Sequence, residues 1–249
     1  FFGRVSRRIY RQADRILITS RMFRDYFRQE FDIPEERIGY LPQYAGDLFD
    51  APLPPKEDRT HVDLLFAGNV GAAQSLDTVL KAAKLLEGEK RLRWHIVGDG
   101  SELEHLKAMA SDLGLECVIF HGRKPLEEMP AYYAMADAML APLTADPFIS
   151  MTLPAKVQTY MAAGKPILSA SNGEIPKVLA AARCGFCAPA EDPEAFAEAV
   201  RQFIACPDKD ALGRNGRSYY ETHFTRQMFM DQLTKELKNG CTEQDIGGI

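Results

Sequence analysis

Residues 62–88 read VDLLFAGNVGAAQSLDTVLKAAKLLEG, and this stretch decides the fold. The apolar run at 62–68 predicts a buried strand, and the pattern over 75–88 predicts a helix that stops at Gly88. The apolar residues of that helix recur at helical spacing: Leu76, Val79, Leu80 and Ala83. A strand, a glycine turn and a helix of this length together indicate the first unit of a parallel sheet.

The same alternation continues toward the C-terminus. Further strands are expected in RWHIVGDG, CVIFHGR, DAMLAPL, KPILSAS and CGFCAPA. Helices are expected over 101–114, 126–136, 154–164, 174–182 and 192–204. Ser101 with Glu104 has the spacing of a capping box, Gly114 marks a helix end, and Pro154 stands in a first turn. We therefore predict an α/β fold with a Rossmann-like parallel sheet covered on both faces.

The two ends of the chain differ from this pattern. Before the linker DAPLPPKED (50–58), the sequence predicts two helices and two strands, at 3–13, 15–20, 21–30 and 37–44. These elements are too few to cover a sheet, so they indicate the remnant of a second α/β lobe. Residues 208–238 have a helical pattern, and NGCTEQDIGGI is expected to fray. The predicted division is 1–50 (remnant and linker), 51–205 (Rossmann-like domain) and 206–249 (C-terminal helices and tail).

Composition restricts the function classes. The 249 residues are 46% hydrophobic and carry a net charge of −5, whereas a binder of the nucleic-acid backbone normally has a basic surplus. No apolar run approaches the roughly 18 residues of a membrane span. Five scattered cysteines favour reduced thiols and a cytoplasmic location. Because the chain begins at Phe1 rather than Met, we expect a piece of a longer protein.

The loops that follow the strands hold the candidate ligand-binding residues, since ligands of open parallel sheets bind at the carboxyl ends of the strands. GNVG (68–71) allows a phosphate to approach the backbone, although a plain tight turn is an equally good interpretation. GDG (98–100) lacks the third glycine of a dinucleotide fingerprint, and no acidic residue ends the second strand. A nicotinamide-dependent oxidoreductase is therefore a disfavoured alternative.

The segment DPFISMTLPAKVQTYMAAGKPI (146–167) is the most informative. Small residues before a helix produce an anion site at the helix N-terminus. Lys156 lies one turn into this helix, where its ammonium can reach a diphosphate. The competing interpretation is a solvated surface lysine.

Several motifs in order now point to one family. FAGNVG, HIVGDGSELEHLK, IFHGR, EEMPAYYAMADAMLAPL and LPAKVQTYMAAGKPILS resemble the C-terminal domain of family 4 (group 1) glycosyltransferases of GT-B architecture, in the branch that builds bacterial capsule and O-antigen. ADRILITSRMFRDYF and RIGYLPQY are similar to the end of that family's N-terminal domain. The likeness covers roughly residues 10–205.

The resemblance implies roles for particular positions. The first-strand loop faces the donor diphosphate and sugar, the loop after the third strand frames the base, and backbone groups after residue 149 approach the phosphates. These positions are Gly68, Asn69, Gly71 and Gln74; Gly122, Arg123 and Lys124; and Ser150, Met151 and Thr152. Many members have Arg and Lys in the first loop. Because this chain has Asn69 and Gln74 there, Lys156 is expected to supply the positive charge.

One departure concerns a glutamate pair. The family commonly has two glutamates eight residues apart, the second of which holds the ribose hydroxyls, and this chain has Met151 and Thr159 instead. A neutral hydroxyl in place of a carboxylate weakens such a contact by about 1–2 kcal/mol.

Other patterns favour structural roles. Cys184 and Cys187 form a C-x-x-C without further zinc ligands nearby, so we expect buried structural cysteines. Asp208-Lys-Asp210 resembles a metal-binding D-x-D but is expected to open a helix. His121 is expected in the core or at the rim of the site.

The first predicted helix has a basic face with an apolar side. Its arginines are Arg4, Arg7, Arg8, Arg11 and Arg15, opposite Phe1, Val5 and Ile9. Two interpretations remain open: peripheral contact with anionic lipid at the inner face of the membrane, and a solvated helix whose apolar side packs on the missing lobe.

The resemblance thus implies a retaining, metal-independent glycosyltransferase, of which this chain is expected to be the donor-binding part. Its donor is expected to be a nucleotide sugar, UDP-linked, and its acceptor a glycan or a lipid-linked glycan in surface-polysaccharide biosynthesis. No separate cofactor and no metal site are expected, and the catalytic residues are not identified. The alternative is a non-catalytic nucleotide-sugar-binding module.

Overall fold

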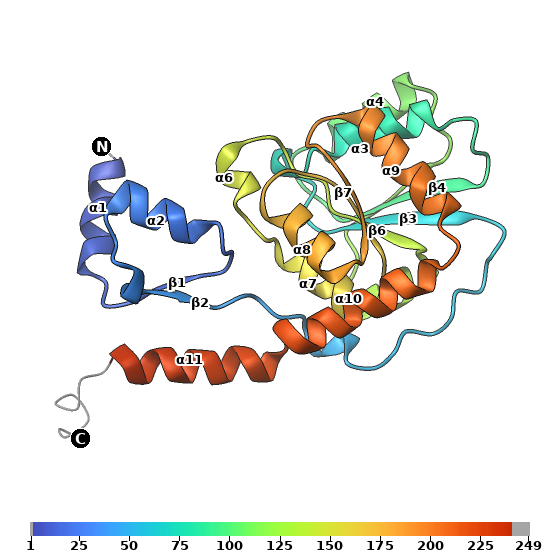
Figure 1. The fold of residues 1–249 in the computed structure, drawn as a ribbon. Coiled ribbons are helices and arrows are strands. Elements are labelled where there is room, and N and C mark those ends of the chain that lie inside the picture. Colours follow the sequence, from blue (N-terminus) through green and yellow to red (C-terminus); the bar gives the residue numbers. More distant parts are fainter. Residues whose placement is uncertain (1, 241–249) are drawn as a thin grey trace.

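The computed structural model describes residues 2–240, so Phe1 and most of the tail that was predicted to fray lie outside the described residues (Figure 1). The larger lobe contains a six-stranded sheet in the order β5-β4-β3-β6-β7-β8, and every neighbouring pair is parallel. Its strands are β3 (Val62–Ala67), β4 (Leu92–Val97), β5 (Val118–Gly122), β6 (Ala138–Leu140), β7 (Ile167–Ala170) and β8 (Gly185–Ala188). This order is that of a doubly wound nucleotide-binding fold, which confirms the predicted α/β class.

Helices cover both faces of this sheet (Figure 1). One face packs against α3 (Leu76–Leu85), α4 (Leu103–Asp112) and α9 (Pro193–Ala205). The other packs against α5 (Met129–Met135), α7 (Ala155–Ala162), α8 (Glu174–Ala182) and α10 (Lys209–His223). Neighbouring β3 side chains point to opposite faces: Leu64 and Phe66 join one core, and Leu65 and Ala67 the other. The central strands are mostly apolar because both of their faces are buried, and Asp63 on β3 and His95 on β4 are buried exceptions.

A smaller lobe precedes the linker. It comprises α1 (Phe2–Gln12), β1 (Ile16–Ile18), α2 (Phe23–Phe31) and β2 (Ile38–Tyr40), and β1 pairs with β2 in parallel. Its core is a separate cluster around Ile18, Phe31 and Ile38. The last helix, α11 (Arg226–Gly240), runs back alongside this lobe, where Glu236 forms an ion pair with Arg15 (Figure 1).

The predicted capping box of α4 is wrong. The helix begins at Leu103, no side chain caps it, and the Ser101 hydroxyl instead lies 3.3 Å from a carboxylate oxygen of Glu102. The Glu102 N–H donates to the Val70 carbonyl at 3.0 Å, and the Leu103 N–H donates to Gly100 at 3.2 Å. Main-chain carbonyls of the packed loops, rather than side chains, therefore accept the N–H groups of Glu102 and Leu103 at the start of this helix.

One predicted helix is divided in the structure, and the predicted C-terminal helices are two. The stretch 126–136 starts with a 3-10 turn over Leu126–Glu128 before α5. The stretch 208–238 is two helices, α10 and α11, separated at Phe224 and Thr225. Asp208 is the N-cap of α10 and accepts the Ala211 N–H at 2.8 Å, which confirms the structural interpretation of the D-x-D.

The linker is fixed to the sheet through charges. The Lys56 ammonium lies 2.6 Å from Asp63 on β3 and also pairs with Asp137, which precedes β6. Within residues 2–240, no helix has the length and apolar character needed to cross a bilayer.

Candidate functional site

The order of the strands reverses between β3 and β6, and the loops that leave these strands meet there. The Thr144 N–H, beyond β6, donates to the carbonyl of Ala73, beyond β3, at 3.1 Å. Ala73 belongs to a 3-10 turn, Ala72–Gln74, that precedes α3. The glycine turn at 68–71 therefore lies at the position where open parallel sheets bind ligands.

Glycines stand at the ends of three neighbouring strands, and one of them, Gly98, allows a close backbone approach. Gly98 has φ +143°, and a Cβ atom there would overlap the carbonyl oxygen of Gly68. The Gly98 N–H donates to the Gly122 carbonyl at 2.9 Å, and the Gly68 N–H donates to Val97 at 3.0 Å. The first, second and third strand-end loops thus form one continuous glycine-rich floor.

A cleft of about 740 Å³ opens above this floor. It unites four of the predicted site residues: Gly68, Asn69, Arg123 and Lys124. Asp99, Pro125, Leu126 and Met129 complete much of its wall. Two cations and an apolar wall suit a flat, hydrogen-bonding ring attached to an anion.

Lys156 lies beside the glycine turn. Its Nζ atom is 4.0 Å from the centre of the Phe66 ring, donates to the side-chain oxygen of Gln74, and would be 3.3 Å from a Cβ atom on Gly68. Within residues 2–240, no carboxylate lies within 4 Å of this ammonium. Burial lowers the pKa of Lys156 to about 7.

The helix that carries Lys156 is fixed to the end of β3. The Tyr160 hydroxyl donates to the Ala67 carbonyl at 3.1 Å and accepts the Ala67 N–H at 3.2 Å. Pro154 is the N-cap of α7, and no side chain caps the helix. The Val157 N–H donates to the Pro154 carbonyl at 2.9 Å, and the first N–H groups of α7 have no side-chain acceptor.

The turn before α7 is occupied by internal bonds. It contains the short helix α6 (Pro147–Ser150), and Asp146 accepts the N–H groups of Phe148 and Ile149. The N–H groups of Ser150, Met151 and Thr152 donate to carbonyls within the same turn, at 2.9, 3.2 and 3.0 Å. The turn consequently presents carbonyls and side chains, including a buried Ser150 hydroxyl that has no hydrogen-bond partner in the described chain.

The two positions at which the resembled family commonly has glutamates, Met151 and Thr159 in this chain, differ in their surroundings. The Thr159 hydroxyl donates to the Ala155 carbonyl of its own helix at 3.0 Å, so only its lone pairs remain for a ligand. The Met151 carbonyl accepts a hydrogen bond from Ser20 of the smaller lobe.

The remaining sequence candidates have structural surroundings. Cys184 is buried as predicted, but Cys187 is exposed, because β8 is the edge strand of the sheet; its predicted burial is wrong. His121 lies 2.9 Å from His95, which in turn bonds Asp63 at 2.9 Å, so His121 belongs to a half-buried polar cluster. Residues 2–240 contain no group of three or more potential metal ligands.

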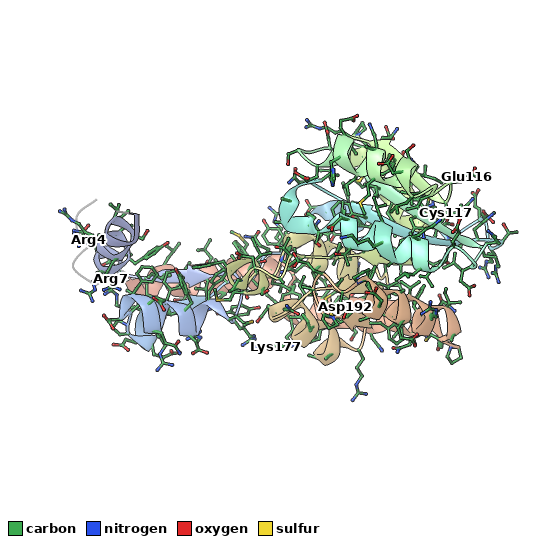
Figure 2. All side chains as sticks on the ribbon, turned by 90° about the horizontal axis from the view of Figure 1, so that it is seen from above. Arg4, Arg7, Glu116, Cys117, Lys177 and Asp192 are labelled. Atoms are coloured by element: carbon green, nitrogen blue, oxygen red, sulfur yellow. The ribbon has the colours of Figure 1, made fainter. Side chains whose placement is uncertain are left out.

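The basic face of α1 is partly engaged. Arg7 donates to the Glu30 carbonyl at 2.7 Å, and Arg11 pairs with Asp32 at 2.8 Å. Val5 and Ile9 are exposed on the same helix. Figure 2 shows Arg4 and Arg7 at the opposite end of the molecule from Glu116 and Cys117.

Sequence reasoning missed several residues that shape the site. Phe66 lies under the Lys156 ammonium, and Gly98 allows the close contact with the Gly68 loop. Neither residue is unusual at the end of a strand, so the sequence did not mark them. Ser20 and Glu174 come from segments far from the glycine turn, and no motif marks them.

Comparison with known proteins places the chain in a family. The model of the family "Glycosyl transferases group 1" matches residues 61–206. The probable glycosyltransferase WbjE of Pseudomonas aeruginosa is 26% identical over 96% of this chain and 61% of its own length. The putative colanic acid biosynthesis glycosyltransferase WcaL of Escherichia coli K12 is 24% identical over 92% and 58%. The chain thus spans about three fifths of these relatives.

Solved structures share the fold. Sucrose-phosphate synthase from Thermosynechococcus elongatus superposes with a TM-score of 0.80 at 20% identity, covering 96% of this chain and 62% of that one. Anabaena HepE in complex with UDP-glucose gives 0.78 at 16%, covering 95% and 67%. With the family model matching more than half of its residues, the chain belongs to the group 1 glycosyltransferases and has the Rossmann-like lobe of the GT-B architecture.

Proposed function

We propose that this chain forms the donor side of a glycosyltransferase that takes a sugar from a nucleoside-diphosphate sugar. The observation that carries the proposal is Lys156: a half-buried ammonium that has no carboxylate partner among residues 2–240 and lies next to a glycine turn and a helix N-terminus. Such a cation is costly to bury alone, and a diphosphate would compensate its charge.

The role of these groups in catalysis would be electrostatic. As the bond between sugar and diphosphate breaks, negative charge grows on the leaving diphosphate. The Lys156 ammonium and the first turn of α7 would stabilise that charge more strongly than the charge of the intact donor. Asn69, Gly71 and Gln74 would line the path of the phosphates.

The cleft beside Gly122, Arg123 and Lys124 would hold the nucleoside. Ser150, Met151 and Thr152 would lie toward the sugar, through carbonyls and side chains because their N–H groups are engaged within the turn. Thr159 would approach the ribose as a hydrogen-bond acceptor.

The names of relatives support a donor and an acceptor class. WcaL and the Erwinia amylovora protein AmsK are named for the biosynthesis of colanic acid and amylovoran, which favours a glycan or lipid-linked glycan acceptor in polysaccharide assembly. HepE is described in complex with UDP-glucose, whereas a Mycolicibacterium smegmatis relative, 29% identical, is named as GDP-mannose-dependent. We favour a UDP-linked donor in the cytoplasm, with retention of configuration and without a metal, as the family resemblance implies.

Calorimetry with UDP, GDP and NAD tests the donor class directly. We expect micromolar to millimolar binding of UDP, weaker binding of GDP and none of NAD, with a matching rise in melting temperature. Sugar transfer by residues 1–249 alone is expected to be absent, because the chain spans only 61% of the length of a relative such as WbjE. Binding of NAD alone would reject the proposal.

Thr159 favours a second candidate, a non-catalytic nucleotide-sugar-binding module. Its hydroxyl already donates to Ala155, so a ribose gains at most a weak contact. Thr159→Glu separates the two functions in the full-length enzyme. A large rise in activity would indicate a degenerate site, whereas little change would indicate an active site that does not need the carboxylate. The control is a UDP-sugar donor made with 2′,3′-dideoxyribose. Any gain in activity that comes from a contact with the ribose hydroxyls must vanish with this donor.

A further inference from the structure

A short segment of the smaller lobe lies against the donor lobe. The Ser20 hydroxyl donates to the Met151 carbonyl, and the Arg21 N–H donates to a Glu174 carboxylate oxygen at 3.2 Å. The Tyr26 ring meets the Phe148 ring edge-on, with centroids 5.1 Å apart. Three contacts therefore join residues 20–26, which follow β1, to two segments of the donor lobe. One is the turn at 147–152 before α7, and the other is the start of α8 at Glu174.

The polar groups of this contact are withdrawn from water. Ser20 is 0% exposed and Glu174 is 3% exposed. Glu174 is the first residue of α8, where the helix dipole favours a carboxylate, and no cationic group of residues 2–240 lies within 4 Å of it. Removing either partner would leave a desolvated acceptor or donor, and such a loss is more costly than losing an exposed hydrogen bond.

The loop before α8 and the turn at 147–152 also pack closely against each other. Gly173 has φ +75°, and a Cβ atom there would overlap the Ser150 carbonyl oxygen and lie 3.2 Å from the Met22 sulfur. The loop before α8 therefore cannot shift without moving the turn that carries Ser150 and Met151. That turn continues through Leu153 and Pro154 into α7 and Lys156.

We propose that Ser20 and Glu174 are positioning residues of the donor site: they clamp the turn at 147–152 between the lobes and so fix the phosphate-facing start of α7. The inference rests on the proposed donor function. The clamp acts on the diphosphate half of the site, and the nucleoside half, at residues 122–124, lies on separate loops that the clamp does not touch. Loss of the clamp should therefore weaken binding of a diphosphate but not of a nucleoside.

The test compares diphosphates with nucleosides on the full chain. UDP and GDP are titrated by calorimetry, and uridine and guanosine by ligand-observed NMR. Ser20→Ala should weaken binding of the preferred diphosphate about threefold to tenfold, the range for one hydrogen bond. Its nucleoside affinity should stay within twofold of the wild type. Ser111→Ala, an exposed serine on α4, is the matched control and should change neither affinity.

Glu174 provides a rescue experiment. Glu174→Ala should weaken diphosphate binding as Ser20→Ala does, whereas Glu174→Gln keeps an oxygen that accepts the Arg21 N–H and should retain it. Amide hydrogen exchange of residues 147–153 should accelerate in both alanine variants and not in Glu174→Gln.

The outcomes are distinct. Equal loss of diphosphate and nucleoside binding, or no loss of either in a wild type that binds the diphosphate, would overturn the clamp and leave the donor function standing. A wild-type chain that binds neither UDP nor GDP would overturn the proposed function itself.

Discussion

The Lys156 ammonium has replaced much of its water with the Phe66 ring and the Gln74 amide oxygen. A cation over an aromatic face gains some attraction, but less than full hydration supplies. Lys156 therefore combines an apolar stem that packs in the protein with a charge that no carboxylate in the described residues compensates. A substitution that removes only the charge separates its effect on ligand binding from its effect on stability.

Lys156→Met keeps the length and apolar stem of the side chain and removes the charge. We expect UDP affinity to fall about tenfold to hundredfold, the range for a hydrogen bond to a charged group, while stability is unchanged or increases. Calorimetry and thermal unfolding measure the two effects. Lys107→Met, at an exposed pair with Glu104, is the control and should leave both values near wild type. Unchanged UDP affinity in Lys156→Met would contradict the role of this charge.

The lowered pKa of Lys156, about 7, predicts a pH dependence of binding. A bound diphosphate favours the charged ammonium and raises its pKa, so binding takes up a proton above pH 7. UDP affinity should then fall between pH 7 and 9, by at most about tenfold per pH unit. The terminal phosphate ionises near pH 6 and contributes little in this range. Titrations in buffers of different ionisation enthalpy count the protons, and Lys156→Met should show a flat profile.

At the scale of elements, the glycine floor decides how closely strand ends approach. Gly98→Ala introduces a Cβ into the Gly68 carbonyl at a φ of +143°, so we expect a loss of about 3 kcal/mol or more in the free energy of unfolding. Gly88→Ala, with no atom within 4 Å of its added Cβ, should change stability by less than about 1 kcal/mol. Urea denaturation of both variants measures the difference; equal values would show that the loops relax freely.

At the scale of the whole molecule, Arg217 on α10 joins the linker to the donor lobe. Its guanidinium donates to the carbonyls of Phe49 at 2.6 Å and Asp50 at 3.2 Å, and to that of Ala162 at the end of α7. Nearby, the Tyr220 hydroxyl accepts the Ala45 N–H at 3.3 Å. These bonds fix the direction in which the chain passes between the lobes.

Arg217→Met should reduce the free energy of unfolding by about 2–3 kcal/mol, because several charge-assisted hydrogen bonds are lost and two linker carbonyls lose their donors. Arg201→Met removes only an exposed pair with Glu198 and should change it by less than about 1 kcal/mol. Denaturation curves for the two variants test this, and a similar small effect in both would mean that the linker is held by packing instead.

The sequence by itself determined the α/β class, because buried parallel strands and amphipathic helices have different periods of apolar residues, as in 62–67 and 76–85. It also named the glycine turn and Lys156 as candidates, although a plain tight turn and a solvated surface lysine fit the same residues equally well or better. Helix boundaries that depend on local chemistry, such as Asp208 before α10, were equally readable.

Only the tertiary structure decided which distant groups meet. At the start of α4, the Glu102 and Leu103 N–H groups donate to the Val70 and Gly100 carbonyls of packed loops, and no side chain caps the helix. Cys187 is exposed because β8 has no outer neighbour. Arg21 and Glu174 are 153 positions apart and come together only when the lobes pack. Such contacts depend on strand order and on how the lobes pack, and these are properties of the whole chain that no local pattern of residues encodes.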